Sequence, residues 1–349
     1  MPWEETPLLG VTQTSSAGVV FRFPHAPGVQ AVRVEVDWPL GDTGPDLRLQ
    51  DGQWQLELPR PAVDRMEYQF LVRAAHGTAV HPDPGNPLRV GNPFGEKSEI
   101  RFPEYRMPGW LTGSDGGRCR PLATAVGKLA CPVPVTLWAP DGLDSGVTAP
   151  LLLANDGSDM TQRGSLLVWA TAAIKEHGPF RVALLDPAHG LRDAWYAAGA
   201  DYADHVALTV LPAIGAQVAV GRTVGLGASL GALSMLMIAQ RHPGVLHALA
   251  LQSGSFFTAA LDPQESGYDY FDRICSAVGV LATGPAVRSD RVLMTCGAVE
   301  ENLANNELMA TALAAQGYRV QSKIVPDAHT MIGWRDAWSP GLEELMSTP

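Results

Sequence analysis

The stretch 227–231, Gly-Ala-Ser-Leu-Gly, has the residue types and spacing of a serine nucleophile on a sharp turn. A short apolar run precedes it, and a long helix-favouring apolar segment follows it as far as Pro243. The serine therefore lies between an expected strand and an expected helix, and glycines suit the flanking positions because the strained turn leaves little room for side chains. The pattern predicts a nucleophilic hydroxyl on Ser229 and a backbone amide of Leu230 that can hold an oxyanion.

A serine hydroxyl is a poor nucleophile near neutral pH, so it needs a histidine base that a carboxylate orients. The histidine and the carboxylate are needed to support a catalytic role for Ser229, because Gly-x-Ser-x-Gly alone is weak evidence in a chain with 36 glycines. Where this turn carries the nucleophile, the acid follows it and the histidine comes last in the chain. His329 follows the last expected strand, 319–325, and is the predicted base.

The acid should follow the expected strand 291–296, where the loop 297–302 offers two carboxylates. Glu300 is nearer to the strand end and is the first choice, with Glu301 as the alternative. One of the two could instead serve as a carboxylate at a helix N-terminus, which the helix dipole favours.

A second oxyanion donor is expected from the loop 155–159, which follows the expected strand 150–154. Gly157 allows close approach of the backbone, and the predicted donors are the amides of Ser158 and Leu230. By itself this loop would be interpreted as a plain Asp-Gly turn.

Two kinds of scaffold are expected to position these residues. Residues 11–102 form short alternating strands divided by turns, which favours a small β-sandwich, and the Pro-, Gly- and Ser-rich stretch 103–118 is the predicted linker. Beyond it strands and helices alternate, so an α/β fold is expected, with a mostly parallel sheet covered by helices on both faces. The expected elements of this part are strands at 133–138, 150–154, 180–185, 223–226, 248–251, 291–296 and 319–325 and helices at 166–176, 202–214, 230–242 and 302–316.

Composition excludes several classes of protein. The chain has 349 residues, 46% of them hydrophobic, and a net charge of -11, which disfavours nucleic acid as a partner. Four cysteines make neither a disulfide framework nor a zinc site. The first ten residues carry no secretory signal and no apolar run is long enough to span a membrane, so a cytoplasmic protein without membrane partners is expected.

With these residues assembled, the chain resembles the enterochelin esterase-like branch of the esterase D group of α/β-hydrolases. The resemblance covers nearly the whole sequence. Its motifs are Asp-Pro-Gly-Asn-Pro at 83–87, Gly-Glu-Lys-Ser-Glu at 95–99, Asp-Gly at 156–157, the serine turn at 227–231, Cys-Gly at 296–297 followed by Glu300, and His-Thr at 329–330 followed by Trp-Arg at 334–335.

The resemblance implies an immunoglobulin-like β-sandwich domain at 1–110 and an α/β-hydrolase domain at 111–349. It also implies a serine esterase that acts through an acyl-enzyme, without metal or organic cofactor, on a small-molecule ester. Its best-known members open the ester bonds of ferric catecholate siderophores in the cytoplasm. Oligomeric state does not follow from the sequence.

Two arginines and three aromatic residues are candidates for binding the substrate. Arg192 and Arg335 could supply positive charge near the site, and Trp195, Tyr196 and Phe256 could line an acyl or aryl pocket, although each aromatic residue is individually more typical of a core. Two alternatives to hydrolysis stay open. One is acyl transfer to an alcohol or sugar by the same serine, and the other is a non-catalytic protein that binds a carbohydrate or partner, with Trp38 and Trp54 as a sugar platform.

Overall fold

The computed structural model describes residues 12–92, 95–284 and 290–347. The chain divides into two compact units. We call the first, which comprises Met1–Arg106 with the short segments Ala298–Glu300 and Pro326–His329, the N-terminal unit, and the second, which comprises the rest, the α/β unit. Residues 1–10, from which the absence of a secretory signal is predicted, lie outside the described part. Within the described residues, no helix has the length and apolar character needed to cross a membrane.

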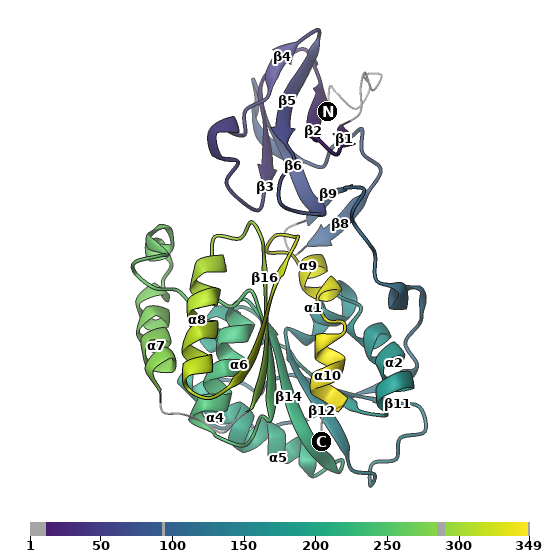
Figure 1. Cartoon of the computed structure of the whole chain (residues 1–349), viewed down its shortest axis with the longest axis vertical. Coiled ribbons are helices and arrows are strands. Elements are labelled where there is room, and N and C mark those ends of the chain that lie inside the picture. Colours follow the sequence, from purple (N-terminus) through teal and green to yellow (C-terminus); the bar gives the residue numbers. More distant parts are fainter. Residues whose placement is uncertain (1–11, 93–94, 285–289, 348–349) are drawn as a thin grey trace. The chain divides into compact units, whose positions relative to one another are not determined.

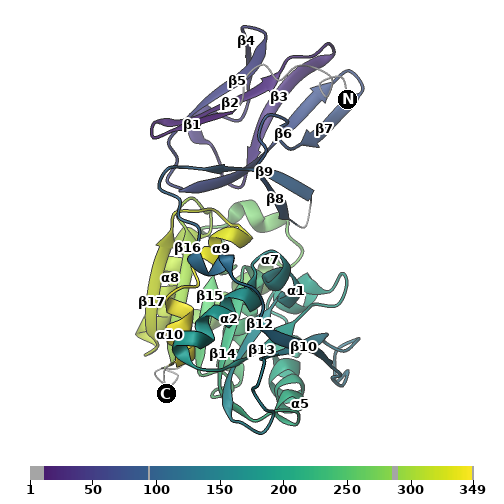
Figure 2. The ribbon, with the colours of Figure 1, turned by 90° about the vertical axis from the view of Figure 1, so that its right-hand side faces the viewer.

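The N-terminal unit contains two antiparallel sheets, whose strands can be followed in Figure 2. One has the order β1-β2-β5-β4 and the other β3-β6-β9-β8, with β7 paired to β6. Apolar residues on alternate positions of β2 and β6, such as Phe21 and Phe70, point into a common core where their rings meet edge to face. The strands are β1 Gln13–Ser15, β2 Gly18–Pro24, β3 Val29–Val36, β4 Arg48–Gln50, β5 Gln53–Pro59, β6 Arg65–Ala74, β7 Gly77–His81, β8 Arg89–Asn92 and β9 Gly95–Arg101.

The α/β unit is built on one eight-stranded sheet with the order β10-β11-β13-β12-β14-β15-β16-β17. The strands from β13 to β17 along this order are parallel, and β10 and β11 pair antiparallel at one edge. Parallel pairing brings the carboxyl ends of β14 to β17 to the same edge of the sheet. The strands are β10 Gly117–Leu122, β11 Val135–Pro140, β12 Ala149–Asn155, β13 Arg181–Leu185, β14 Val220–Ala228, β15 Ala248–Gln252, β16 Arg291–Gly297 and β17 Arg319–Val325.

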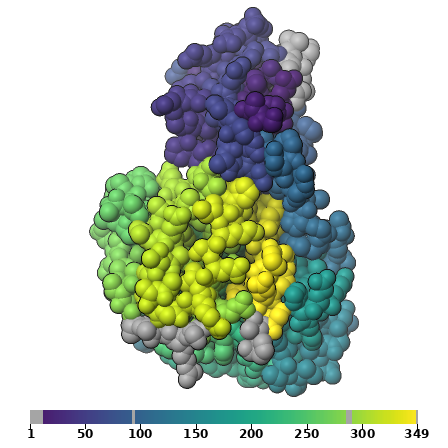
Figure 3. All heavy atoms as spheres, viewed as in Figure 1, coloured from purple at the N-terminus to yellow at the C-terminus, as the bar shows by residue number. Residues whose placement is uncertain are grey.

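Helices cover both faces of this sheet, with α1, α2 and α10 on one side and α6, α7 and α8 on the other (Figure 1). Strand β12 shows why two cores form, because Leu151 and Leu153 enter one and Leu152 and Ala154 enter the other. The α-helices are α1 Gly157–Gln162, α2 Leu166–His177, α3 Arg192–Tyr196, α4 Ala200–His205, α5 Leu211–Gly215, α6 Leu230–Arg241, α7 Phe271–Thr283, α8 Leu303–Ala315, α9 Met331–Asp336 and α10 Gly341–Ser347. In the space-filling view the C-terminal third of the chain forms much of the visible surface of this unit (Figure 3).

The expected strands and helices are present in the α/β unit, but the sequence did not predict the helices α1, α3, α7, α9 and α10. Two further differences concern an edge strand and a helix. The predicted linker 103–118 contains a short 3-10 helix, Gly109–Thr112, and the first residues of β10. Strand β10 lies at the edge of the sheet, and its mostly exposed residues show no apolar pattern that would have predicted a strand. The helix predicted at 202–214 is continuous but changes to a π-helical turn at Val206–Val210 between α4 and α5.

Candidate active site

Ser229 occupies a sharp turn between β14 and α6. Its backbone angles, a φ of 54° and a ψ of -126°, lie in a region that residues other than glycine rarely adopt. A Cβ atom added at Gly227 would lie 2.3 Å from the carbonyl oxygen of Gly231, and one added at Gly231 would lie 3.3 Å from Oδ2 of Asp156. Close packing therefore requires glycine at position 227 and leaves little room at position 231, and the strand, turn and helix have the geometry of a nucleophile elbow.

The loop after β15 supports the elbow. The amide of Ser229 donates to the carbonyl of Gln252 at 2.9 Å, and the amide of Ser255 donates to the carbonyl of Ser229 at 3.2 Å. The two hydroxyls also meet, with Oγ of Ser229 3.2 Å from Oγ of the buried Ser255. Ser229 itself is half-buried. The hydroxyl thus has a defined partner while it remains partly accessible.

Ser255 was not among the residues predicted from the sequence. Polar residues directly after a parallel strand were the available signal, since Ser253 and Ser255 follow β15 immediately. Ser253 fixes this loop further because its Oγ accepts the indole N–H of Trp334 at 2.8 Å.

His329 and Glu300 form a close pair within the N-terminal unit. Nδ1 of His329 lies 2.8 Å from Oε2 of Glu300. The Glu300 side chain is 1% exposed and that of His329 is 33% exposed. A carboxylate can only accept, so the neutral ring carries its proton on Nδ1 and presents a lone pair at Nε2. This is the arrangement that a general base needs.

The neighbouring carboxylate is placed differently. Glu301 is exposed and accepts a hydrogen bond from Nε2 of Gln264 at 3.3 Å. Of the two glutamates that the sequence offered, the structure pairs Glu300 with the histidine.

The amide of Ser158, a predicted oxyanion donor, is bonded to an aspartate in this structure. This amide donates to Oδ1 of Asp186 at 2.8 Å, and the Ser158 hydroxyl donates to Oδ2 at 2.8 Å. The loop nevertheless lies beside the elbow, because Nδ2 of Asn155 donates to the carbonyl of Gly231 at 3.1 Å. Leu230, the other predicted donor, is the first residue of α6, where the amides of a helix have no intrahelical partner.

Two arginines expected near the substrate have acidic partners. Arg192 makes a bidentate pair with Asp156, with Nε and Nη2 each 2.8 Å from a carboxylate oxygen. Burial alone lowers the pKa of Arg192, but the bond to Asp156 outweighs it and the net shift is upward. Arg335 is buried, and its Nε lies 2.7 Å from Oδ1 of Asp336. Each guanidinium is therefore already neutralised by an aspartate.

The three aromatic residues predicted to line a pocket belong to the core instead. Trp195, Tyr196 and Phe256 are all buried, and Tyr196 and Phe256 have no exposed surface. Trp195 stacks on Tyr202 with ring centroids 5.4 Å apart. Trp195 and Tyr196 thus pack with α4 in the core, and Trp195 also borders a hollow of about 360 Å³.

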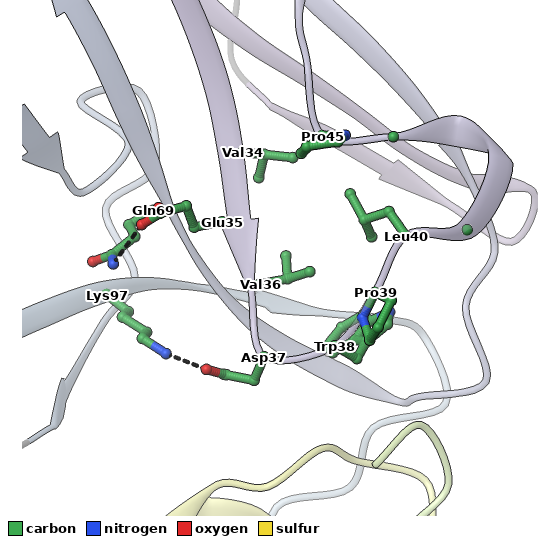
Figure 4. A pocket seen from close by; sticks show the side chains of 12 residues that line it. Val34, Glu35, Val36, Asp37, Trp38, Pro39, Leu40, Pro45, Gln69 and Lys97 are labelled. Atoms are coloured by element: carbon green, nitrogen blue, oxygen red, sulfur yellow. Dashed lines mark hydrogen bonds and ion pairs between the residues drawn. The ribbon is translucent and has the colours of Figure 1, made fainter. Parts of the chain in front are cut away.

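A separate hollow of about 620 Å³ lies in the N-terminal unit beside β3 (Figure 4). Trp38, Pro39 and Leu40 form its apolar part, and the ion pair of Lys97 with Asp37 closes its polar part. Its charged groups have partners within the hollow, since Lys97 pairs with Asp37 and Oε2 of Glu35 accepts from Nε2 of Gln69 at 3.1 Å. Trp54, the other residue of the suggested sugar platform, packs with Trp38 against the core of this unit.

Among the described residues, no group of three or more histidine, cysteine, aspartate or glutamate side chains is arranged to hold a metal ion. Ser229 offers a hydroxyl, and the separate pair of His329 and Glu300 offers an imidazole with its carboxylate.

The mostly parallel sheet between two layers of helices, with a serine elbow after β14, defines an esterase-like fold of the α/β-hydrolase type. Comparison with solved structures shows that the fold is similar to that of enterobactin esterases. The ferric enterobactin esterase of Salmonella typhimurium superposes with a TM-score of 0.72 at 19% identity, over 94% of this chain and 93% of that one. The enterobactin esterase of Shigella flexneri, solved in the presence of enterobactin, gives 0.72 at 18% identity over 94% and 92%.

A ferulic acid esterase matches less of the molecule, with a TM-score of 0.54 at 16% identity over 66% of this chain and 98% of that one. No protein-family model and no curated protein sequence matches the chain. The similarity therefore shows a shared esterase fold.

Proposed function

We propose that this protein is a serine carboxylic-ester hydrolase. The observation that carries the proposal is the strained elbow of Ser229 together with the 2.8 Å pair of His329 and Glu300. A strained backbone of this kind costs about 1–3 kcal/mol, and such residues cluster at active sites. A hydroxyl in that position and a histidine with an oriented lone pair are the two halves of a nucleophilic site.

The chain order supports a meeting of Ser229 with His329. Ser229 comes directly after β14, Glu300 three residues after β16 and His329 four residues after β17. Because these strands are parallel members of one sheet, all three residues follow strand ends at the same edge. On this ground we assign His329 as the base of Ser229 and Glu300 as the residue that orients the imidazole.

The proposed reaction has two half-reactions. Oγ of Ser229 attacks the ester carbonyl while Nε2 of His329 takes its proton, and the proton then passes to the alcohol as the carbon–oxygen bond of the ester breaks. Water attacks the acyl-enzyme with the same base, which releases the acid and restores the serine. No metal or organic cofactor takes part.

The amide of Leu230 is one proposed oxyanion donor, and the second needs revision. The amide of Asp156 donates to the Tyr196 hydroxyl at 3.3 Å and that of Ser158 to Asp186, so we assign the second donor to Gly157 between them. Removing one such donor typically costs about 2.7–4 kcal/mol of barrier lowering.

The proposed substrate is a small ester, and ferric catecholate siderophores are the first class to test because the enterobactin esterases share the fold. Arg192 and Arg335 are already paired with aspartates, so they add little net positive charge to attract a highly anionic substrate. Simple acyl and aryl esters therefore belong in the same screen.

The test is covalent and kinetic. A fluorophosphonate should label Ser229, and p-nitrophenyl esters of short acids should release nitrophenol in a burst that reports the acyl-enzyme. Ser229→Ala should lose both. Full ester turnover by Ser229→Ala would reject the mechanism. Products that carry the acyl group on an added alcohol or sugar, in place of free acid, would reassign the reaction to acyl transfer.

A further inference from the structure

The two segments that carry Glu300 and His329 belong to the compact N-terminal unit, although both follow strands of the α/β sheet in the chain. Val299 packs against the core of that unit. The amide of Asp64 donates to the carbonyl of Pro326 at 2.7 Å. The N-terminal unit therefore provides the immediate packing of the histidine and its carboxylate.

Arg65 makes the strongest of these connections. It is the first residue of β6 and is fully buried. Its Nη1 lies 3.1 Å from Oδ2 and 3.3 Å from Oδ1 of Asp327, which is two residues before His329. Asp327 is itself buried, and its Oδ1 accepts the amide of Ala328 at 2.7 Å. One carboxylate thus binds a guanidinium on the sheet and fixes the turn that leads to the histidine.

Strand pairing holds Arg65 itself in place. Nη2 donates to Oε1 of Glu67 at 2.6 Å and Nε to Oε1 of Glu99 at 2.8 Å. Residues two apart on a strand share a face, and β6 and β9 pair so that Glu67 lies opposite Glu99. Arg101, on the same face of β9, adds a second cation by donating to Oε2 of Glu99 at 3.0 Å.

A guanidinium surrounded in this way has little freedom to move. A planar fork that binds three separate carboxylates fixes direction as well as distance, which a lysine ammonium could not do. Buried ion pairs add little net stability on average, so stability alone gives a poor account of four buried charges. The contacts of Arg65 with Asp327 instead support a role in fixing the geometry of the turn 326–329.

We propose that Arg65, acting through Asp327, is a positioning residue for His329, and that the N-terminal unit is in this way part of the catalytic apparatus. The inference rests on the proposed role of His329 as base. Arg65 and Asp327 are not proposed to touch the reacting atoms. They hold the backbone turn 326–329, and with it the imidazole that Glu300 orients.

The test compares variants of Asp327 in the full-length protein. Asp327→Ala removes both bonds to Arg65 and the bond to the amide of Ala328, while Arg65 keeps its two glutamates. Asp327→Asn retains an oxygen that can accept from the same donors, so it is the conservative variant expected to rescue. Val72→Ala is the stability control, because Val72 is a buried core residue of β6 that is not part of the ion cluster.

Circular dichroism first establishes that each variant is folded at 25 °C. At that temperature kcat and KM on a p-nitrophenyl ester and the rate of fluorophosphonate labelling are measured, and the melting temperature is determined separately. Asp327→Ala should lower kcat and the labelling rate by about 100-fold with KM little changed, because a misplacement of about 1 Å in a catalytic group has effects of that size. Asp327→Asn should recover most of this loss. Val72→Ala should melt at a lower temperature with kcat within about 2-fold of the wild type, since core truncation away from the site acts on stability.

The inference is overturned if Asp327→Ala retains wild-type kcat and labelling rate, or if Val72→Ala loses as much activity as Asp327→Ala at equal melting temperature. Should Asp327→Ala fail to fold, Arg65→Lys provides the same comparison, because lysine keeps the charge and loses the fork. A wild-type protein that neither hydrolyses esters nor reacts with the fluorophosphonate would instead reject the proposed function, so the two failures are separable.

Discussion

Oε2 of the buried Glu300 lies 2.8 Å from Nδ1 of His329, while the adjacent Glu301 is exposed and bonded to Gln264. Two chemically identical side chains that are neighbours in the chain therefore have separate environments. Only one of them can fix the tautomer of the imidazole. The chain supplies a matched pair of substitutions for testing that difference.

Glu300→Gln should lower kcat by about 10³- to 10⁴-fold, because an amide at this position no longer stabilises the protonated imidazole and can favour the wrong tautomer. Glu301→Gln should change kcat by less than about 2-fold. Steady-state kinetics on a p-nitrophenyl ester measures both. Equal losses in the two variants, or a larger loss at Glu301, would contradict the assignment.

Gly227→Ala should destabilise the protein more than Gly231→Ala. The added methyl group at position 227 would lie 2.3 Å from a backbone oxygen that cannot move without unwinding the start of α6. At position 231 the nearest atoms, Cβ of Asn155 and Oδ2 of Asp156, are 3.3 Å away. We expect a loss of about 1–3 kcal/mol or more for the first and less for the second. Urea denaturation checks the order, and a reversed order would show that the elbow packs differently.

Ser255→Ala should slow fluorophosphonate labelling and kcat by about 2- to 10-fold. The hydroxyl of Ser255 lies 3.2 Å from that of Ser229, and a neutral hydrogen bond contributes about 0.5–1.5 kcal/mol. KM should stay near the wild-type value, since Ser255 is buried. Ser234→Ala is a suitable control because Ser234 is a buried serine of α6 outside this contact. A loss as large as that of Ser229→Ala would mean that Ser255 takes a direct part in the chemistry.

Asp327 makes stability depend on pH in a defined direction. Burial raises the pKa of Asp327 to about 6 in spite of the opposing effect of Arg65, whereas an unfolded aspartate titrates near ~3.9. A carboxyl group with a raised pKa in the folded state stabilises it at low pH, and that contribution is lost as the pH rises from about 4 to about 6. The stability of the wild type relative to Asp327→Asn should thus fall across this window by about 1–3 kcal/mol. Denaturant unfolding at pH 4, 5, 6 and 7 measures it, and a rise would contradict the sign.

Much of the α/β unit could be predicted because its elements are local. The strand expected at 319–325 coincides with β17, and the turn at 227–231 is an elbow, since alternation, apolar runs and glycines act over a few residues. Short edge strands such as β1, β4 and β10 were missed, because exposed polar residues carry no periodic signal.

The long-range features could not be predicted in the same way. Nothing local indicates that Arg65 pairs with Asp327, which lies 262 positions away. The burial of Trp195 and Tyr196 could not be predicted for a related reason, because a helix of five residues is too short for its sequence to show which side faces the core. The bond of the Ser158 amide could not be predicted because its partner Asp186 comes from a different strand end.

The positive φ of Ser229 has a consequence for how this sequence can change over time. Glycine adopts that backbone conformation freely, so Ser229→Gly should raise the melting temperature while it removes the hydroxyl. Mutational drift guided by folding alone would therefore move the position towards glycine. If homologous sequences keep serine there against this gradient, the hydroxyl itself is under selection.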